Sequence, residues 1–377
     1  MRIVYCMCSV YNPGGMERVL LNKVEWLRKH TPWEVTVVTT DQQGREPFYP
    51  FPEGVRMVDL GINYSADNGK GAFGKIAGYL RKRRKHRKRL EALLKELKPD
   101  VTVSLFPSES GFLPDLTDGS RKVLELHFCK MFRLQYGRMG LLGLIDRWRS
   151  KQDEKLVRKF DRFVVLTEED KELWGEMENI RVIPNAAVAS ELPAASTEAK
   201  RVIAAGRLDY QKGFDRLLEA WAIAKKDERA TDWQLDIFGQ GEWREKLVNQ
   251  AKELGIADSA HINAPTKRIE EEWRRSGIHA MSSHYEGLPM VMIEAMAAGL
   301  PEVTMDFQCG PRDIIRHGEN GLMVKEGDTQ AMAEALLELM LDPEKRRRMG
   351  QEAQKVKEQF SEERIMAQWV KLFKELE

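Results

Sequence analysis

The sequence predicts an α/β protein with two successive domains, each a parallel β-sheet covered by helices. Segments typical of strands and of helices alternate along most of the chain, which is the pattern of βαβ units. The length of 377 residues suggests about two domains. The alternation restarts after residues 185–199, which are rich in Ala, Ser and Glu and show little periodicity. We therefore expect the interdomain linker there.

Both halves of the chain supply short apolar runs that predict strands. In the first half the predicted strands are residues 3–8, 34–39, 101–105, 122–128, 162–166 and 180–183, with a helix at 16–29. In the second half they are residues 201–205, 234–238, 261–264, 278–281, 303–305 and 322–324, and three helices follow from residue 330. The expected boundaries are 1–186, a linker at 187–199, 200–360, and a last helix at 361–377. Because ligands bind at the carboxyl ends of parallel strands, we expect these ends to face one another across a cleft.

The composition excludes few functions. Lys and Arg number 60 and Asp and Glu number 59, so the net charge of +1 predicts no partner. The four cysteines, at positions 6, 8, 129 and 309, lack paired zinc spacing. We expect buried free thiols in a reducing cytosol, and neither a metal site nor a disulfide. No apolar run approaches the ~18 residues of a membrane span, and residues 1–15 are more typical of a strand and turn than of a signal peptide.

The most informative stretch is residues 285–299. Glu286 lies in a predicted loop after a buried strand, Gly287 permits a tight turn, and Pro289 suits the first position of a helix that ends at Gly299. Glu294 lies on the second turn of that helix among apolar neighbours, so we expect a helix without a solvated face. A carboxylate there needs partners, because burying an unpaired charge is costly. The plain alternative is that Glu294 pairs with a basic side chain and Glu286 is an ordinary loop residue.

A ligand with phosphates and hydroxyl-rich rings would satisfy this stretch. The amino end of the predicted helix offers N–H groups and partial positive charge that suit a phosphate. The two carboxylates could accept hydrogen bonds from hydroxyls. A nucleotide-sugar combines both features.

A second loop, Gly206-Arg207-Leu208-Asp209-Tyr210-Gln211-Lys212-Gly213, follows the first strand of the second half. Arg207 and Lys212 would lie at the carboxyl end of that strand, where they could hold a diphosphate and neutralise its charge as it leaves. The alternative is a solvated loop. No Asp-x-Asp triplet occurs, so a carboxylate-held Mg²⁺ or Mn²⁺ has no evident site, and the two cations could replace it.

Weaker signals occur at three other places. Gly14 and Gly15 join the first strand to the first helix, where the backbone could approach an anion or a polar ligand, although many such turns are only turns. Gly239-Gln240-Gly241 lacks the third glycine of a dinucleotide motif and favours a tight turn beside a nucleotide. His127 ends a predicted strand, and a single His is more often structural than catalytic.

Residues 81–89 are all basic and lie in a predicted helix whose apolar stripe stops there. Anionic lipid headgroups are the expected partner of Arg81, Arg83, Arg84 and Arg87, at ~1 kcal/mol per basic residue. A solvated helix is the alternative, and nucleic acid is disfavoured because no interleaved aromatic residues could stack on bases. Residues 139–145 are apolar and could add a membrane contact or belong to the core.

Taken together, these motifs resemble the retaining glycosyltransferases of the large "family four" group, which have the GT-B fold of two Rossmann-like domains. Residues 286–294 match the Glu-x7-Glu motif, Gly206-Arg207 with Lys212-Gly213 matches the diphosphate signature, and Gly14-Gly15-Met16-Glu17-Arg18 matches the amino-terminal Gly-Gly motif. Ile183-Pro184-Asn185 resembles the segment before the linker, and Cys309-Gly310-Pro311-Arg312-Asp313 resembles a block of polysaccharide-building members.

The resemblance implies sugar transfer from a nucleoside-diphosphate sugar, with retention at the anomeric carbon and with no metal or other cofactor. It implies that Arg207 and Lys212 stabilise the departing diphosphate, that Glu286 contacts the donor sugar, and that Glu294 binds the ribose hydroxyls. It also places His127 near the transferred sugar, and it implies that the amides of Gly287 and Leu288 hold a phosphate or the sugar. The backbone around Pro265 would contact the base. The first domain would bind the acceptor, the second the donor, and the last helix would cross back to the first domain.

The expected protein is therefore a cytoplasmic glycosyltransferase, peripheral on the inner face of the plasma membrane, that uses a UDP- or GDP-sugar and a lipid-linked or surface-polysaccharide acceptor. A sugar-nucleotide epimerase or hydrolase on the same fold, and a non-catalytic nucleotide-sugar-binding membrane adaptor, are the alternatives. One residue departs from the family pattern: Glu302 stands where an apolar strand residue is usual, and the sequence offers no physical reason for it.

Overall fold

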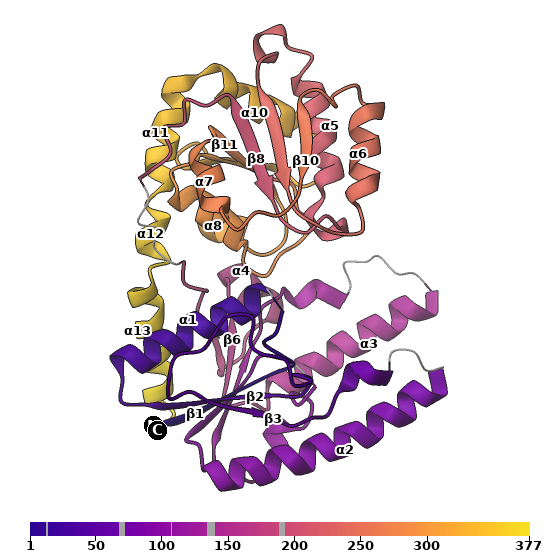
Figure 1. Cartoon of the computed structure of the whole chain (residues 1–377), viewed down its shortest axis with the longest axis vertical. Coiled ribbons are helices and arrows are strands. Elements are labelled where there is room, and N and C mark those ends of the chain that lie inside the picture. Colours follow the sequence, from indigo (N-terminus) through magenta and orange to yellow (C-terminus); the bar gives the residue numbers. More distant parts are fainter. Residues whose placement is uncertain (13, 68–71, 107, 134–139, 188–192) are drawn as a thin grey trace. The chain divides into compact units, whose positions relative to one another are not determined.

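The computed structural model describes residues 1–12, 14–67, 72–106, 108–133, 140–187 and 193–377 (Figure 1). The chain forms two compact units. The first unit comprises Met1–Leu166, Lys171–Pro184 and Ile365–Glu377, and the second comprises Thr167–Asp170 and Asn185–Arg364. The last segment of the chain thus belongs to the first unit.

The first unit is built on a parallel sheet of seven strands in the order β3-β2-β1-β4-β5-β6-β7. The strands are β1 (Arg2–Met7), β2 (Glu34–Thr39), β3 (Arg56–Asp59), β4 (Val101–Ser104), β5 (Arg121–Glu125), β6 (Arg162–Val165) and β7 (Ile180–Val182). Its helices are α1 (Gly15–His30), α2 (Ala72–Leu97), α3 (Gly140–Val157), most of α4 (Glu168–Trp174) and α13 (Glu362–Lys374), of which residues from Ile365 onward belong to this unit.

Helices cover both faces of this sheet. Residues at alternate positions of β1 and β5, Val4, Cys6 and Leu124, join a core with Leu90 and Leu94 of α2, because successive side chains of a strand point to opposite faces. On the other face α1 and α13 lie side by side (Figure 1), where the rings of Trp33, just after α1, and Phe373 of α13 are 6.1 Å apart.

The second unit has a parallel sheet of six strands in the order β10-β9-β8-β11-β12-β13. The strands are β8 (Arg201–Ala205), β9 (Gln234–Phe238), β10 (Ala260–Asn263), β11 (Ile278–Met281), β12 (Glu302–Asp306) and β13 (Gly321–Lys325). Its helices are α5 (Phe214–Ala224), α6 (Arg244–Glu253), α7 (Ile269–Arg274), α8 (Met290–Ala297), α9 (Pro311–Ile314), α10 (Thr329–Leu341), α11 (Pro343–Ala353) and α12 (Val356–Gln359). Its largest core joins α5, α6 and α10 to the sheet, and a smaller cluster joins α7 and α8 to it.

Each sheet reverses its strand order once, between β1 and β4 in the first unit and between β8 and β11 in the second. In doubly wound folds, ligands bind outside the carboxyl ends of the strands at such a switch point. In the second unit this position brings together the loop after β8 and the loop after β11.

Every predicted strand is present, and the largest difference is at residues 126–128, which lie beyond the end of β5. The strand β3 was not predicted, because its four residues RMVD include only two apolar ones and none is buried. Three helices were predicted after residue 330, but the structure has four helical segments, since the short α12 separates α11 from α13. The predicted linker lies partly outside the described residues.

Two further expectations concern single features. All four cysteines are free, and Cys6, Cys129 and Cys309 are buried, but the prediction of buried thiols is wrong for Cys8, which follows β1 and is exposed. Within the described residues, no helix combines the length and the apolar character that crossing a membrane requires.

Candidate functional site

The loops after β8 and β11 meet through a buried ion pair. Lys212 Nζ lies 2.7 Å from Glu286 Oε1, and the two side chains are 11% and 8% exposed. The hydroxyl of Ser283 donates to the same carboxylate oxygen at 2.8 Å, and Gln211 Nε2 donates to the other at 3.2 Å. A buried charge is stable only with such partners. The structure therefore brings together two residues that the sequence motifs placed 74 positions apart.

Arg207 lies at the outer side of this network. Its side chain is 69% exposed, lies 3.4 Å from the Asp209 carboxylate, and donates to Gln211 at 2.5 Å. Gln211 thus connects Arg207 to Glu286. One cation is fixed inside the network and the other is open to solvent, where an anionic ligand can reach it.

Glycines allow the backbones of neighbouring loops to touch at this edge of the sheet. A side chain at Gly239 would collide with the carbonyl of Gly206, and one at Gly206 would collide with the aliphatic part of Lys212. Gly213 has φ of +59° and lies against the carbonyl of Ser282, so any other residue there would meet both strain and a clash. These glycines leave room for the aliphatic part of Lys212 beside Gly206, so that its ammonium group reaches Glu286.

The helix that follows Glu286 differs from the sequence prediction in two respects. It begins at Met290, one residue after Pro289, which is its N-cap. Glu294 is exposed, so the prediction that this helix has no solvated face is wrong: its apolar neighbours are turned to the core, and Glu294 occupies the open side. Leu288 is buried and Gly287 partly so, in the turn that leads into the helix.

Three residues that the sequence analysis did not select position the loop after β11. Arg216, near the start of α5, donates to the carbonyls of Ser282 and Ser283, each at 3.1 Å, and pairs with Glu326 at 2.8 Å. The ring of Tyr210 stacks on His284 with centroids 4.0 Å apart. Burial, followed by the charge of Arg216, lowers the pKa of His284. Arg216 follows Gly213 by three positions, and this proximity to the motif was the available signal.

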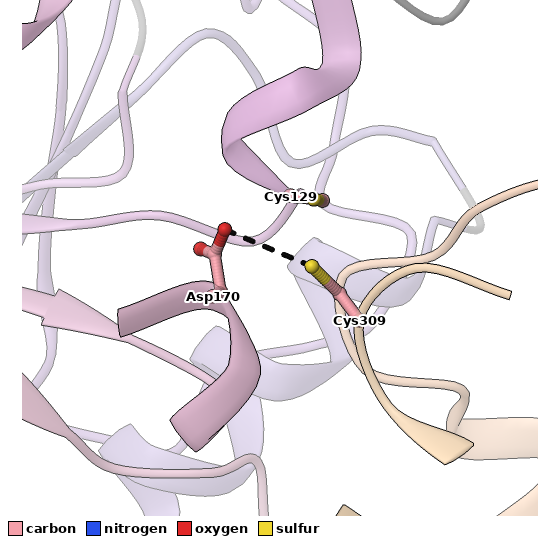
Figure 2. Close-up of side chains that lie close together, drawn as sticks. All are labelled: Cys129, Asp170 and Cys309. Carbon is pink, nitrogen blue, oxygen red and sulfur yellow. Dashed lines mark hydrogen bonds between the residues drawn. The ribbon is translucent and has the colours of Figure 1, made fainter. Parts of the chain in front are cut away.

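Pro265 is exposed in the loop after β10, at the edge of the sheet, where the sequence analysis expected the base. The Cys309 block is anchored within the second unit. The backbone N–H of Cys309 donates to Glu169, and its thiol donates to Asp170 over 3.7 Å, as Figure 2 shows.

In the first unit, Gly14 is the N-cap of α1 and Gly15 its first residue. The carboxylate of Glu17 lies where a side chain at Gly14 would be, whereas the space above Gly15 is open. Burial raises the pKa of Glu17 against the opposing effect of a backbone hydrogen bond. An acidic group therefore already lies at this helix end, which favours a hydroxyl-bearing ligand over an anion.

His127, just beyond β5, belongs to a buried polar group. Its Nε2 lies 3.0 Å from Glu125 Oε1, and the same oxygen accepts a hydrogen bond from Lys23 of α1. Burial alone would raise the pKa of Glu125, but Lys23 and His127 outweigh it and lower the pKa to about 2. The sequence analysis selected His127 and missed Lys23 and Glu125.

The basic run of α2 is partly structural, whereas its sequence predicted either a membrane contact or a solvated helix. Lys82, Arg83 and Arg89 donate to the backbone carbonyls of residues 63, 111 and 60, and His86 is buried among Tyr64 and Phe112. Arg87 makes a longer contact of 3.4 Å to the carbonyl of residue 115. Arg81 and Arg84, together with Lys88, are exposed and have no hydrogen bond or ion pair within the described residues. In the apolar run 139–145, the side chains of Leu144 and Ile145 are exposed, and Met139 lies outside the described residues.

Glu302, the unexplained departure, has a partner on the adjacent strand. The register pairs it with His279 of β11, and the two side chains lie 2.5 Å apart and almost fully buried. Burial raises the pKa of Glu302, although His279 opposes the rise. His279 thus supplies the polar partner that the buried Glu302 needs.

Two family models match the chain. "Glycosyltransferase Family 4" matches residues 13–190, and "Glycosyl transferases group 1" matches residues 190–356. An uncharacterised glycosyltransferase of Haemophilus influenzae is 30% identical over 375 residues, covering 98% of each chain. The chain belongs to the group 1 glycosyltransferases, and its two parallel-sheet units have the GT-B fold.

Other relatives are named for polysaccharide synthesis. The amylovoran biosynthesis glycosyltransferase AmsD of Erwinia amylovora is 27% identical, and the alignment covers 98% of both chains. An exopolysaccharide phosphotransferase of Streptomyces coelicolor is 37% identical over 57% of this chain, and the match spans only 23% of that relative.

Solved structures agree on the fold. TarM of S. aureus, determined with UDP among its ligands, superposes with a TM-score of 0.78 at 16% identity over 99% of both chains. HepE of Anabaena, determined with UDP and glucose, superposes with a TM-score of 0.75 at 16% identity over 100% of both chains.

Proposed function

We propose that this glycosyltransferase moves a sugar, with retention of the anomeric configuration, from a UDP- or GDP-sugar to a lipid-linked or cell-surface polysaccharide acceptor. The observation that carries the proposal is the Lys212–Glu286 pair at the switch point of the second unit, with the open cation of Arg207 beside it. The two neighbours solved with UDP and the relative named for amylovoran synthesis support the same class of donor and acceptor.

In the proposed reaction the bond between the anomeric carbon and the diphosphate oxygen breaks, and a bond to the acceptor oxygen forms on the same face of the sugar. The proton of the acceptor hydroxyl passes to the departing diphosphate. Negative charge grows on that diphosphate in the transition state, and Arg207 and Lys212 lower the barrier by stabilising it.

The remaining residues bind the donor. Glu286 accepts hydrogen bonds from the sugar hydroxyls, and the exposed carboxylate of Glu294 accepts them from the ribose. The amides of Gly287 and Leu288 hold a phosphate, and the loop at Pro265 contacts the base. Two cations neutralise the diphosphate, so the proposed reaction uses no metal, and transfer should persist in excess chelator.

A donor screen tests this function. Purified protein is incubated with individual UDP- and GDP-sugars, and thermal shift identifies the bound donor, because a ligand stabilises the folded state by mass action. Transfer is then measured with a membrane extract as acceptor, and NMR gives the anomeric configuration of the product. Glu294→Ala should raise the KM for the donor with little change in kcat. Inversion at the anomeric carbon, or turnover of the donor to an epimer, would reject the proposal.

We further propose that the first unit associates with the anionic cytoplasmic face of a membrane. Arg81, Arg84 and Lys88 recur at spacings of three and four residues, so they share one face of α2. Each basic residue near an anionic membrane contributes ~1 kcal/mol. The exposed side chains of Leu144, Ile145 and Trp148 in α3 could add apolar contact.

Vesicle sedimentation tests this association. Replacing Arg81, Arg84 and Lys88 with Gln should abolish binding to vesicles that contain phosphatidylglycerol, while donor binding stays unchanged. The same charge change at the exposed residues Lys226, Lys252 and Arg268 of the second unit serves as the control. Equal sedimentation of both triple variants and the wild type would reject the proposed membrane face.

A further inference from the structure

We infer that Lys23 and Glu125 are positioning residues for His127. Glu125 accepts the hydrogen of His127 Nε2, Lys23 holds Glu125 in its charged form, and the imidazole therefore presents Nδ1 as a hydrogen-bond acceptor for a hydroxyl of a sugar ligand. The contact with a sugar rests on the proposed function. The arrangement of the three side chains does not, and it can be tested without a ligand.

The three side chains are almost completely buried and share one carboxylate oxygen. Glu125 is 0% exposed, and its Oε1 accepts from both Lys23 Nζ and His127 Nε2, the latter at 3.0 Å. The side chains of Lys23 and His127 are each 5% exposed. The ammonium group of Lys23 and the imidazole of His127 thus share a single carboxylate oxygen inside the first unit.

The positions of Lys23 in its helix and of Glu125 at the end of its strand explain why the two side chains meet. Leu20, Val24 and Leu27 form the buried stripe of α1, and Lys23 lies within it, so its side chain enters the core. Glu125 is the last residue of β5 and His127 follows it by two positions, so both lie at the same end of that strand. A lysine within an apolar stripe needs a charged partner, and Glu125 supplies it.

The charges of Lys23 and Glu125 stabilise each other. The pKa of Glu125 lies near 2, so Glu125 is a carboxylate that only accepts hydrogen bonds. Burial lowers the pKa of Lys23, but the charge and hydrogen bond of Glu125 oppose that change. Opposite a carboxylate, His127 Nε2 must carry the hydrogen, which leaves a lone pair on Nδ1 in the neutral ring.

The last helix of the chain completes the enclosure. Lys23 Nζ lies 4.0 Å from the ring centroid of Trp369 in α13, a cation–π contact inside the first unit. Trp369 is fully buried, so it excludes water from the ammonium group. The carboxyl-terminal segment therefore contributes to the surroundings of Lys23, which is 346 positions earlier in the sequence.

Proton NMR of protein labelled with ¹⁵N-histidine tests the network. A hydrogen shared between His127 Nε2 and a buried carboxylate exchanges slowly with water, so the wild type should show a protected imidazole N–H resonance that His127→Gln removes. The double variant Lys23→Met/Glu125→Leu should fold, since a buried ion pair can be exchanged for apolar side chains, and it should lose the resonance. The control Lys122→Met/Asp118→Asn removes the buried pair at the other end of β5 and should keep it.

Enzyme kinetics supply the second readout. Once the donor is known, the double variant should lower kcat/KM roughly tenfold, the effect of one misplaced hydrogen bond, and His127→Gln combined with it should cause no further loss. A protected N–H resonance that survives in the double variant, or that is absent from the wild type, would overturn the inference. Loss of the resonance in a protein that transfers no sugar would uphold the network and reject the proposed function.

Discussion

Arg207 and Lys212 come from the same loop but differ in burial, so we expect their replacement to affect the stability of the fold differently. Arg207 is exposed, so Arg207→Ala should leave the midpoint of thermal unfolding unchanged while lowering kcat about 10²- to 10³-fold, as expected for the loss of a charge-stabilising donor. Lys212→Ala should lower kcat similarly and also destabilise the fold, since Glu286 would remain buried without its cation.

Steady-state kinetics and thermal unfolding check this pair of variants. Arg229→Ala is the matched control for Arg207, because Arg229 is 71% exposed and lies in the same unit. Wild-type turnover in Arg207→Ala, or an unfolding midpoint for Lys212→Ala equal to that of the wild type, would contradict the roles given to these side chains.

The buried carboxyl group of Glu109 should make the stability of the protein depend on pH. It is fully buried in the loop after β4, and burial raises its pKa from 4.5 to about 7. The folded state therefore holds this proton more tightly than the unfolded state, so the free energy of unfolding falls as pH rises from 4.5 through 7. Glu109→Gln should remove this slope and stabilise the protein at pH 8 by up to about 3 kcal/mol, with little effect near pH 4.5.

Urea unfolding of wild type and Glu109→Gln at several pH values measures this effect. Glu125, with a pKa near 2, stays charged over the same range and adds no slope. Parallel curves for the two proteins between pH 5 and 8 would show that Glu109 titrates normally.

At the scale of elements, β11 and β12 are joined by His279 and Glu302. Glu302→Leu alone should cost about 1–3 kcal/mol, because His279 is left buried without a partner. The double variant His279→Leu/Glu302→Leu should be as stable as the wild type or more so, since apolar side chains often replace a buried polar pair without loss. Denaturant unfolding measures both, and additive losses in the double variant would refute the compensation.

The last helix, α13, should stabilise the first unit. Its buried residues Ile365, Met366, Trp369, Leu372 and Phe373 recur at helical spacing on one face. Phe373→Ala should cost about 3–5 kcal/mol through the lost burial and the cavity left behind, whereas Lys374→Ala, on the exposed face, should cost little. Limited proteolysis should then release fragments of the first unit sooner. Equal cleavage of both variants would show that α13 adds no stability.

The sequence predicted the strands well because buried parallel strands are continuous apolar runs, as in β1 and β6, where every residue after the initial arginine is apolar and buried. It missed β3, whose residues are half exposed. It placed Lys212 and Glu286 each in a loop that follows a strand of the second half, but the order of those strands came only from the structure. It could not predict the exposure of Glu294, which depends on how α8 is rotated, or the partners of Lys23 and Glu302, which lie on distant segments.

At the scale of the whole molecule, the chain combines two α/β units whose switch points carry different chemistry. The first has a helix end already covered by Glu17 and a histidine held by a carboxylate, which suits uncharged hydroxyl groups. The second has the cations of Arg207 and Lys212, which suit a diphosphate. This difference supports the proposal that the diphosphate of the donor binds to the second unit.

Hydrogen exchange with mass spectrometry, with and without the donor found in the screen, tests this assignment most directly. Bound donor should slow amide exchange in residues 206–213 and 283–290, because the ligand orders both loops and excludes water from them. Exchange in β3 and α2 should not change. Protection confined to the first unit, or no protection at 206–213 and 283–290 with the donor at saturation, would contradict the donor site.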